Sequence, residues 1–278
     1  GNIFTQLFFN LNAMLRSSAA PQKAMIAIIG MVFIVVILNP IFIFGLKMGM
    51  RGSALATVLS QGIMLCYQLH HFYNKNNCIY FQKGIFKLRW NMISKMMSIG
   101  LSPFFMNLTA CMVVIIITNS LTRYGGDVAV GAYGIINRFL FFFVMIVIGL
   151  MQGMQPIVGY NFGAKLYNRA FKALKLSIMF ATFISVIGFL LGEFFPDMIT
   201  SMFTTDKQLT EIAASGMRIM MMAVPLLGIQ VISTGFFQSI GYVKTAIFLS
   251  LLRQLILIIP ALLVFPLFFG LNGFFNCA

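Results

Sequence analysis

The side chains able to titrate, bind a metal or act as nucleophiles are few in this sequence. Among its 278 residues there are two histidines, four cysteines and five carboxylates. His70 and His71 are adjacent, so they cannot lie on one side of a helix, and no two cysteines form a C-x-x-C pair. The sequence therefore predicts no metal site, no cofactor and no enzyme, because it lacks a constellation of catalytic groups. The carboxylates all lie in loops or near the ends of apolar stretches: Asp127, Glu193, Asp197, Asp206 and Glu211.

Amide side chains inside long apolar stretches are stronger candidates for a functional site. An amide in hydrocarbon without a hydrogen-bond partner costs several kcal/mol, so it faces other helices or a wet cavity. Steps of 100° per residue bring one tyrosine, one phenylalanine and two amides of the stretch 128–156 to nearly one side. With amides from 97–121 and 212–240, they are our candidates for a substrate cleft: Asn107, Tyr133, Asn137, Phe141, Gln155 and Gln230. The alternative is that these side chains join helix to helix.

Four further polar or irregular residues inside apolar stretches are interpreted as structural. Pro156 frees a backbone carbonyl, which donors such as Gln152 and the neighbouring Gln155 can satisfy. Arg138 and Arg253 lie several residues from either surface, and buried cations in membrane helices reach a partner or the interface. We expect them to contact carbonyls or amides, with direct binding of an anionic substrate as the alternative.

The composition places these residues in a membrane protein. Hydrophobic residues make up 60% of the chain and charged residues only 9%, whereas a soluble domain carries roughly 25% charged residues. We therefore predict an all-α polytopic membrane protein. Stretches long enough to cross a bilayer lie near 24–46, 50–73, 97–121, 128–156, 173–195, 212–240 and 245–269, with further helices at 3–17 and from 273 onward.

The distribution of the cations predicts the orientation in the membrane. With residues 74–95 on the cytoplasmic side, twelve of the nineteen Lys and Arg residues face inside and four face outside. This agrees with the positive-inside rule. The net charge of +14 is thereby explained without a nucleic-acid partner. Binding of anionic lipid by the basic loop 165–175 is a secondary interpretation.

A weak internal repeat predicts the domain organisation. FGLKMGMRG (44–52) resembles FPLFFGLNG (265–273). LRSSAAPQKA (15–24) aligns with FQSIGYVKTA (237–246) at nearly the same offset in residue number. Six crossings separate the copies, which predicts parallel six-helix bundles related by a pseudo-two-fold axis along the membrane normal. The chain would then be a fragment holding about helices 4–11 of twelve. We predict an incomplete first lobe (1–73), a cytoplasmic linker (74–95) and a second lobe (96–278).

Several stretches closely resemble bacterial MATE (multidrug and toxic compound extrusion) transporters. The resemblance implies two lobes facing a central cleft that opens alternately to each side of the bacterial cytoplasmic membrane. It also implies export of small organic, often cationic compounds in exchange for H+ or Na+, by a monomer in the lipid bilayer. The stretches are PIFIFGLKMGMRGSALATVLSQ (40–61), LSPFFMNL (101–108), TNSLTRYGGDVAVGAYGIINR (118–138), GLMQGMQPIVGYNFGA (149–164), STGFFQSIG (233–241) and FLSLLRQ (248–254).

At one position that the resemblance connects with ion coupling, the residue type in this sequence differs from the family pattern. In one branch of the family an Asp precedes Pro-Ile-Phe-Ile in the fifth helix, and this sequence has Asn39 there. Asparagine forms hydrogen bonds but cannot titrate in the physiological range, so Asn39 is an ion-coupling candidate without the acid. Two alternatives to an antiporter stay open: a flippase for a lipid-linked saccharide, and an inactive truncated relative.

Overall fold

The computed structural model describes residues 2–18, 20–73, 90–204 and 206–251. These residues form helices and short turns, with no strand within these ranges. The chain divides into two compact units, residues 1–89 and 90–278, which we call unit 1 and unit 2.

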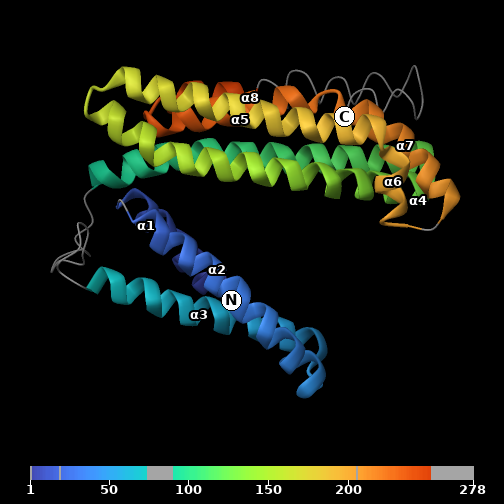
Figure 1. Cartoon of the computed structure of the whole chain (residues 1–278), viewed down its shortest axis with the longest axis horizontal. Helices are drawn as coiled ribbons and strands as arrows, with labels where there is room; N and C mark the ends of the chain where they lie inside the picture. The colour runs from blue at the N-terminus through green and yellow to red at the C-terminus, as the bar shows by residue number, and fades with distance from the viewer. Residues whose placement is uncertain (1, 19, 74–89, 205, 252–278) are drawn as a thin grey trace. The chain divides into compact units, whose positions relative to one another are not determined.

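Unit 1 is a bundle of three helices around a small apolar core. Its elements are α1 (Asn2–Ser17), α2 (Pro21–Pro40), the π-helical turn η1 (Ile41–Gly45) and α3 (Gly49–Tyr73). Figure 1 shows α1, α2 and α3 packed side by side. Side chains from all three helices form the core: Phe8, Leu11, Leu15, Ala24, Ala27, Leu65 and Phe72.

Two prolines and one glycine determine the course of the chain from α2 to α3. Pro21 begins α2, where the backbone nitrogen of a helix has no partner in any case. Pro40 cannot donate a helical hydrogen bond, and η1 follows it, with the Leu46 amide donating to the Ile41 carbonyl over 3.0 Å. At Gly52 a Cβ atom would lie 2.8 Å from the Phe42 carbonyl oxygen. The absence of a side chain therefore lets α3 pack directly against η1.

Unit 2 is built around the long element α4 (Trp90–Gly163), which is two helical segments joined at Gly126. Gly126 has φ 65° and ψ −165°, a conformation that only glycine adopts readily. Figure 1 shows the two segments of α4 running beside each other, with α5 and α8 along them. The remaining elements are α5 (Tyr167–Phe194), α6 (Pro196–Ser201), α7 (Lys207–Met221), α8 (Val224–Ser239) and α9 (Val243–Leu251).

The helices confirm the predicted class of all-α polytopic membrane protein. Among the residues that the structure describes, four helices are long and apolar enough to cross a bilayer: Pro21–Gly45, Trp90–Thr122, Gly126–Gly163 and Tyr167–Phe194. Residues 90–95, which we expected in the linker, belong to the second of these helices. The rest of that linker and most of the span expected at 245–269 lie outside the described residues.

The stretch 212–240, expected to cross the bilayer, is bent in the structure. α7 and α8 meet at an angle of 51°. The break comes just before Pro225, which lacks an N–H group and clashes with the carbonyl four residues earlier, that of Met221. α8 can therefore restart after Met222 and Ala223 but cannot continue α7 in line.

Candidate functional site

The predicted cleft residues on the second segment of α4 do not share one environment. Asn137 and Phe141 are exposed, Phe141 to 53% of its surface. Tyr133 is partly buried and packs against the apolar core of unit 2. Gln155 is partly buried at the other end of the segment. The 100° spacing thus identified one side of the helix, but its neighbours cover that side only in part.

Arg138 is next to Asn137 and is also exposed. It makes no hydrogen bond to any residue within the described ranges, so the expected contact with a neighbouring amide is not seen there. Arg253, the second arginine interpreted as structural, lies outside the described residues. Exposed Asn137, Arg138 and Phe141 together offer an amide, a cation and an aromatic ring on one stretch of helix.

Asn107, the candidate on the first segment of α4, bonds within its own helix. Its Nδ2 donates to the Pro103 carbonyl over 2.8 Å, and the side chain is exposed. Pro103 and Asn107 lie one turn apart, so this bond links no second helix. The amide oxygen still has capacity to accept a hydrogen bond.

Gln155 joins α4 to α8 at the end of both helices. Its Nε2 lies 3.4 Å from Oε1 of Gln238, a long amide–amide hydrogen bond. A Cβ atom at Gly235 would lie 3.7 Å from the same Nε2 and 2.3 Å from Cγ of Met151, so glycine permits this approach. Helical spacing singled out Gln230 rather than Gln238, although Gln238 lies within the stretch that carries the family resemblance.

Gln152 and Pro156 flank Gln155 inside α4. Both are partly buried, and the helix continues past the proline to Gly163. Gln152 takes part in an interaction within the structure, and its structural role stays a prediction. The proline therefore leaves the helix intact instead of ending it.

Gln230 links α8 to α9. Its Nε2 donates to the Leu249 carbonyl over 3.1 Å. Its Oε1 is buried and has no partner within the described part of the chain. The contact matches the helix–helix alternative that we set beside a role in the cleft.

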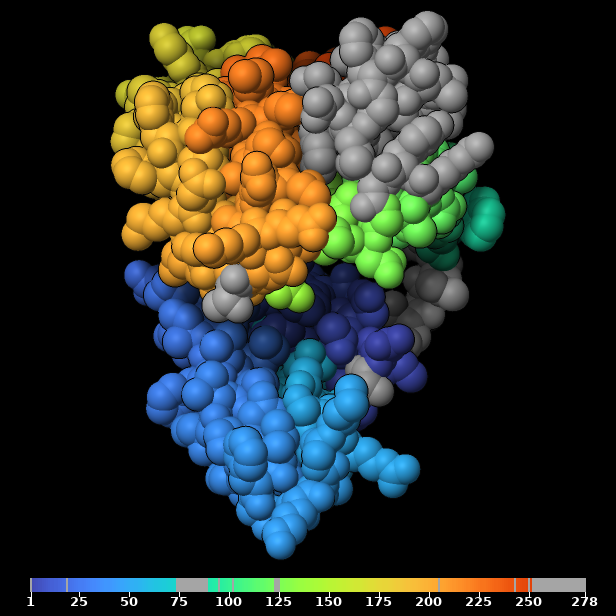
Figure 2. Space-filling model, turned by 90° about the vertical axis from the view of Figure 1, so that its right-hand side faces the viewer, coloured from blue at the N-terminus to red at the C-terminus, as the bar shows by residue number. Residues whose placement is uncertain are grey.

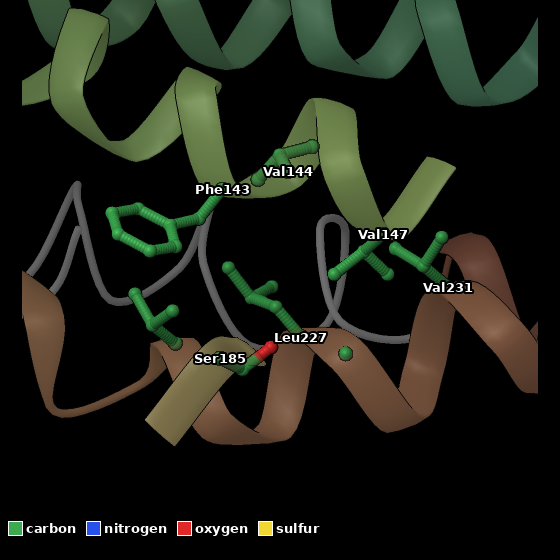
Figure 3. Close-up of a pocket in the computed structure, with 8 residues that line it drawn as sticks. Phe143, Val144, Val147, Ser185, Leu227 and Val231 are labelled. Atoms are coloured by element: carbon green, nitrogen blue, oxygen red, sulfur yellow. The ribbon is translucent and has the colours of Figure 1, made fainter. Parts of the chain in front are cut away.

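A small cavity lies between α4, α5 and α8 (Figure 3). Its free volume is about 10 Å³, which is close to the least that a single water molecule needs. The Ser185 hydroxyl, seen beside Leu227 in Figure 3, is the one polar side-chain group among the described lining residues. Organic ligands need pockets of roughly 300–1,000 Å³, so this cavity is a packing defect and not a substrate site. Its lining is Phe143, Val144, Val147, Ser185, Val224, Leu227, Gly228 and Val231.

Unit 1 contains buried polar side chains between its helices that the sequence reasoning missed. Thr5 Oγ1 of α1 donates to Gln61 Oε1 of α3 over 2.8 Å. Gln68 lies seven residues after Gln61, is fully buried, and neither of its amide atoms has a partner among the described residues. Asn12 lies seven residues after Thr5 and donates from Nδ2 to the Ala24 carbonyl over 2.9 Å. The shared spacing of seven, two helical turns, was the available signal.

Asn39, the candidate for ion coupling, lies where the geometry of its helix changes. It is partly buried, and its Oδ1 has no partner in the described structure. Pro40 and the π-helical turn η1 follow it directly. Isolated π turns occur often at functional sites, but an asparagine there can only accept or donate hydrogen bonds.

The carboxylates of unit 2 lie at the ends of its helices. Asp206 is the N-cap of α7, and its Oδ1 accepts from the Gln208 amide over 3.0 Å. Figure 2 looks onto this end of unit 2, where α6 and α7 form one surface. A shallow hollow there is lined by Asp197, Ser201, Thr204, Lys207, Thr210 and Glu211. Within the ranges that the structure describes, no group of three or more His, Cys, Asp or Glu residues could hold a metal ion.

Comparisons with known proteins agree on one family. The family model described as MatE matches residues 103–263. Over 270 residues the chain is 30% identical to the multidrug export protein MepA of Staphylococcus aureus (strain MSSA476), covering 97% of this chain and 59% of that protein. The MepA protein of Staphylococcus haemolyticus (strain JCSC1435) matches with the same identity and coverage. The chain thus spans about three fifths of the length of these relatives.

Solved structures share the fold. The MATE multidrug transporter DinF-BH is 34% identical with a TM-score of 0.87, covering 100% of this chain and 62% of that chain. A MATE crystal structure in complex with MaL6 has a TM-score of 0.88 at 19% identity, covering 97% of this chain and 61% of that chain. The second match shows a common architecture and carries no information on substrate.

Proposed function

Because this chain belongs to the MatE family, whose matched members are transporters and not enzymes, we propose that it forms part of an exporter of small organic compounds. The compounds would be amphipathic and often cationic, and they would cross the bacterial cytoplasmic membrane. The match to proteins named as multidrug exporters over 97% of this chain carries the proposal. The order of apolar helices supports it, because they are long enough to cross a bilayer.

The exposed side of α4 supplies groups suited to such substrates. The Phe141 ring offers a face for a flat cation, since aromatic faces attract positive charge. Asn137 offers both a donor and an acceptor on the adjacent turn. Few directional contacts and much apolar surface favour broad rather than narrow selectivity.

Alternating access moves helices relative to one another, and unit 2 has two places where the helical backbone is already broken. One is Gly126, where α4 reverses direction, and the other is the 51° break between α7 and α8. A few residues at element ends commonly absorb the backbone change in domain motions. We propose that both sites bend as the transporter opens to either side.

Exchange for H+ or Na+ requires a group that changes its charge or ligands, and a carboxylate is the usual group in a membrane. The sequence carries no carboxylate in the middle of an apolar stretch, and Asn39 replaces the acid that the family pattern has. We therefore propose that residues 1–278 bind substrate and change shape, and that a carboxylate elsewhere in the protein couples transport to the ion.

A flippase for a lipid-linked saccharide is the second candidate function. Exposed Arg138 favours it, because a cation inside a transport path suits an anionic headgroup. Replacing Arg138 with glutamine distinguishes the two candidates. Export of a cationic dye would persist or improve in the variant, whereas movement of an anionic lipid would be lost.

Dye accumulation in efflux-deficient cells tests the main proposal. Cells that express the full-length protein should retain less ethidium than cells with an empty vector, and collapse of the proton or sodium gradient should abolish the difference. Unchanged dye levels with verified membrane expression would contradict drug export. Export that is insensitive to both gradients would contradict antiport but leave export itself standing.

A further inference from the structure

A group of four cations marks the beginning of α5. Lys165 lies in the turn before the helix, and Arg169, Lys172 and Lys175 follow within its first turns. All four side chains are exposed or partly exposed, and none forms an ion pair with a residue in the described ranges. The sequence contains no acid between Asp127 and Glu193, so no carboxylate of this segment neutralises the four cations. We call them the α5 basic group.

The α5 basic group points away from the core of unit 2. The buried residues of α5 are small and lie on one side of the helix: Ala170, Ala181, Ser185, Gly188 and Gly192. At 100° per residue, Arg169, Lys172 and Lys175 are centred about 180° from that buried side. The cations therefore face whatever surrounds unit 2 at this helix.

An apolar stripe continues along the same side of α5. Met179 and Phe183 are exposed to 59% and 64% of their surfaces, and Ile187 and Leu190 to 37% and 43%. At about 1.5 Å per residue, Met179 to Leu190 covers about 16 Å, roughly half of a ~30 Å hydrocarbon core. The outward side of α5 thus has a cationic end followed by apolar surface about one leaflet deep.

Aromatic side chains surround the cationic end. Tyr160 is exposed to 78% and Tyr167 to 48% of its surface. The rings of Phe162 and Tyr167 lie 5.3 Å apart, edge to face, which holds Tyr167 beside the turn. Tyrosines at this depth are typical of the headgroup region of a bilayer. The positions of cations, tyrosines and apolar stripe match the headgroup, interface and acyl chain of a phospholipid.

We propose that the outward face of α5 is a binding site for an anionic phospholipid of the cytoplasmic leaflet. The headgroup phosphate would contact the α5 basic group, and an acyl chain would lie along Met179 and Phe183. Charge complementarity selects the anionic lipid, since a zwitterionic headgroup brings its own cation to the same surface. The proposal concerns the lipid-facing surface and does not depend on which substrate is exported.

Quenching of a local tryptophan by brominated lipid tests this site. In the full-length protein with its other tryptophans replaced, Met179→Trp puts the reporter on the apolar stripe. The protein is reconstituted in phosphatidylcholine vesicles containing increasing amounts of dibrominated phosphatidylglycerol or dibrominated phosphatidylcholine. We expect about a tenfold preference for phosphatidylglycerol at this reporter. Equal quenching by the two lipids would overturn the proposal.

Variants show whether the cations cause the preference. Replacing all four with glutamine should abolish it, whereas exchanging each lysine for arginine and Arg169 for lysine should preserve it. The milder double variant Lys172→Gln and Lys175→Gln keeps two cations that maintain the orientation of the protein in the membrane. In this variant the preference for phosphatidylglycerol should fall about threefold. A preference that survives the fourfold change would refute the site.

Matched controls distinguish this site from general lipid enrichment. A reporter at exposed Leu226 of α8 should show little preference. A second control replaces four exposed cations of other regions with glutamine, and it should leave the lipid preference at the Met179→Trp reporter unchanged. These cations are Lys47, Arg51, Lys207 and Arg218. An equal preference at the Leu226 reporter would mean that the whole surface attracts the lipid, which contradicts a site on α5.

Discussion

Replacing Gly228 with alanine is expected to destabilise unit 2, because α5 and α8 approach each other closely there. A Cβ atom at position 228 would lie 2.6 Å from Ser185 Oγ, 3.0 Å from the Ala181 carbonyl oxygen and 3.2 Å from its carbon. The serine hydroxyl can rotate away. The Ala181 carbonyl belongs to the backbone of α5, so the two helices themselves must separate by a few tenths of an ångström.

Two opposing terms determine the size of the effect. Overpacking a tightly packed site costs about 1–3 kcal/mol, while alanine gains up to about 1 kcal/mol over glycine in helix propensity. The net loss is therefore about 1 kcal/mol, equivalent to a fall of about 2–4 °C in melting temperature for a unit of this size. A larger side chain enlarges the first term, and valine gains less helix propensity than alanine, so Gly228→Val should cost about 3 kcal/mol or more.

Thermal unfolding of the purified full-length protein measures this loss. Gly149 of α4 provides the control, because a Cβ atom there would meet no described atom within 4 Å. Gly149→Ala should therefore keep or slightly raise the melting temperature, since only the propensity gain applies.

The order of the variants decides the outcome. We expect Gly149→Ala to melt highest, then the unchanged protein, then Gly228→Ala and finally Gly228→Val. If Gly228→Ala and Gly149→Ala melted together, α5 and α8 would be farther apart than the structure shows, and the close contact at Ala181 would be wrong.

Three further predictions concern buried amides, a helix cap and the exposed side of α4. Gln68→Met should raise the melting temperature by a few degrees, because it removes a buried amide that has no partner among the described residues. Gln61→Met should lower it, because Thr5 loses the acceptor of its hydrogen bond. Asp206→Ala should reduce hydrogen-exchange protection in the first turn of α7 by about 1 kcal/mol, and Asp206→Asn should not, since both Asp and Asn cap helices. Phe141→Ala should lower ethidium export without changing the melting temperature, while Phe142→Ala, about 100° around the helix, should leave export intact. A loss of export in both Phe variants with equal expression would contradict a specific role for Phe141.

The helices were predicted well from the sequence because the bilayer imposes their length. The stretches 24–46, 50–73 and 173–195 correspond to Pro21–Gly45, Gly49–Tyr73 and Tyr167–Phe194. A segment that crosses hydrocarbon must remain apolar for about 20 residues and satisfy its backbone internally. Length and composition alone therefore locate it. The bend between α7 and α8 was missed because hydropathy does not register the backbone effect of Pro225.

The partners of the polar residues could not be predicted in the same way. Helical spacing places Gln155 on a side of α4, but it does not say which helix covers that side. Only the packing of α8 brings Gln238 within 3.4 Å of it, and only the packing of α1 on α3 pairs Thr5 with Gln61. Asn107 differs from these pairs, because its amide donates to a carbonyl of its own helix.

The sequence by itself determined the class of protein and most of its long helices, because transfer of each residue between water and lipid depends on that residue and its neighbours in the chain. Short motifs in the sequence also identified the family. Tertiary structure alone decided which helix faces approach, where glycines admit a neighbour and which amides share a hydrogen bond. Those features depend on contacts between segments far apart in the chain, and a periodic pattern within a single helix does not identify which segment it meets.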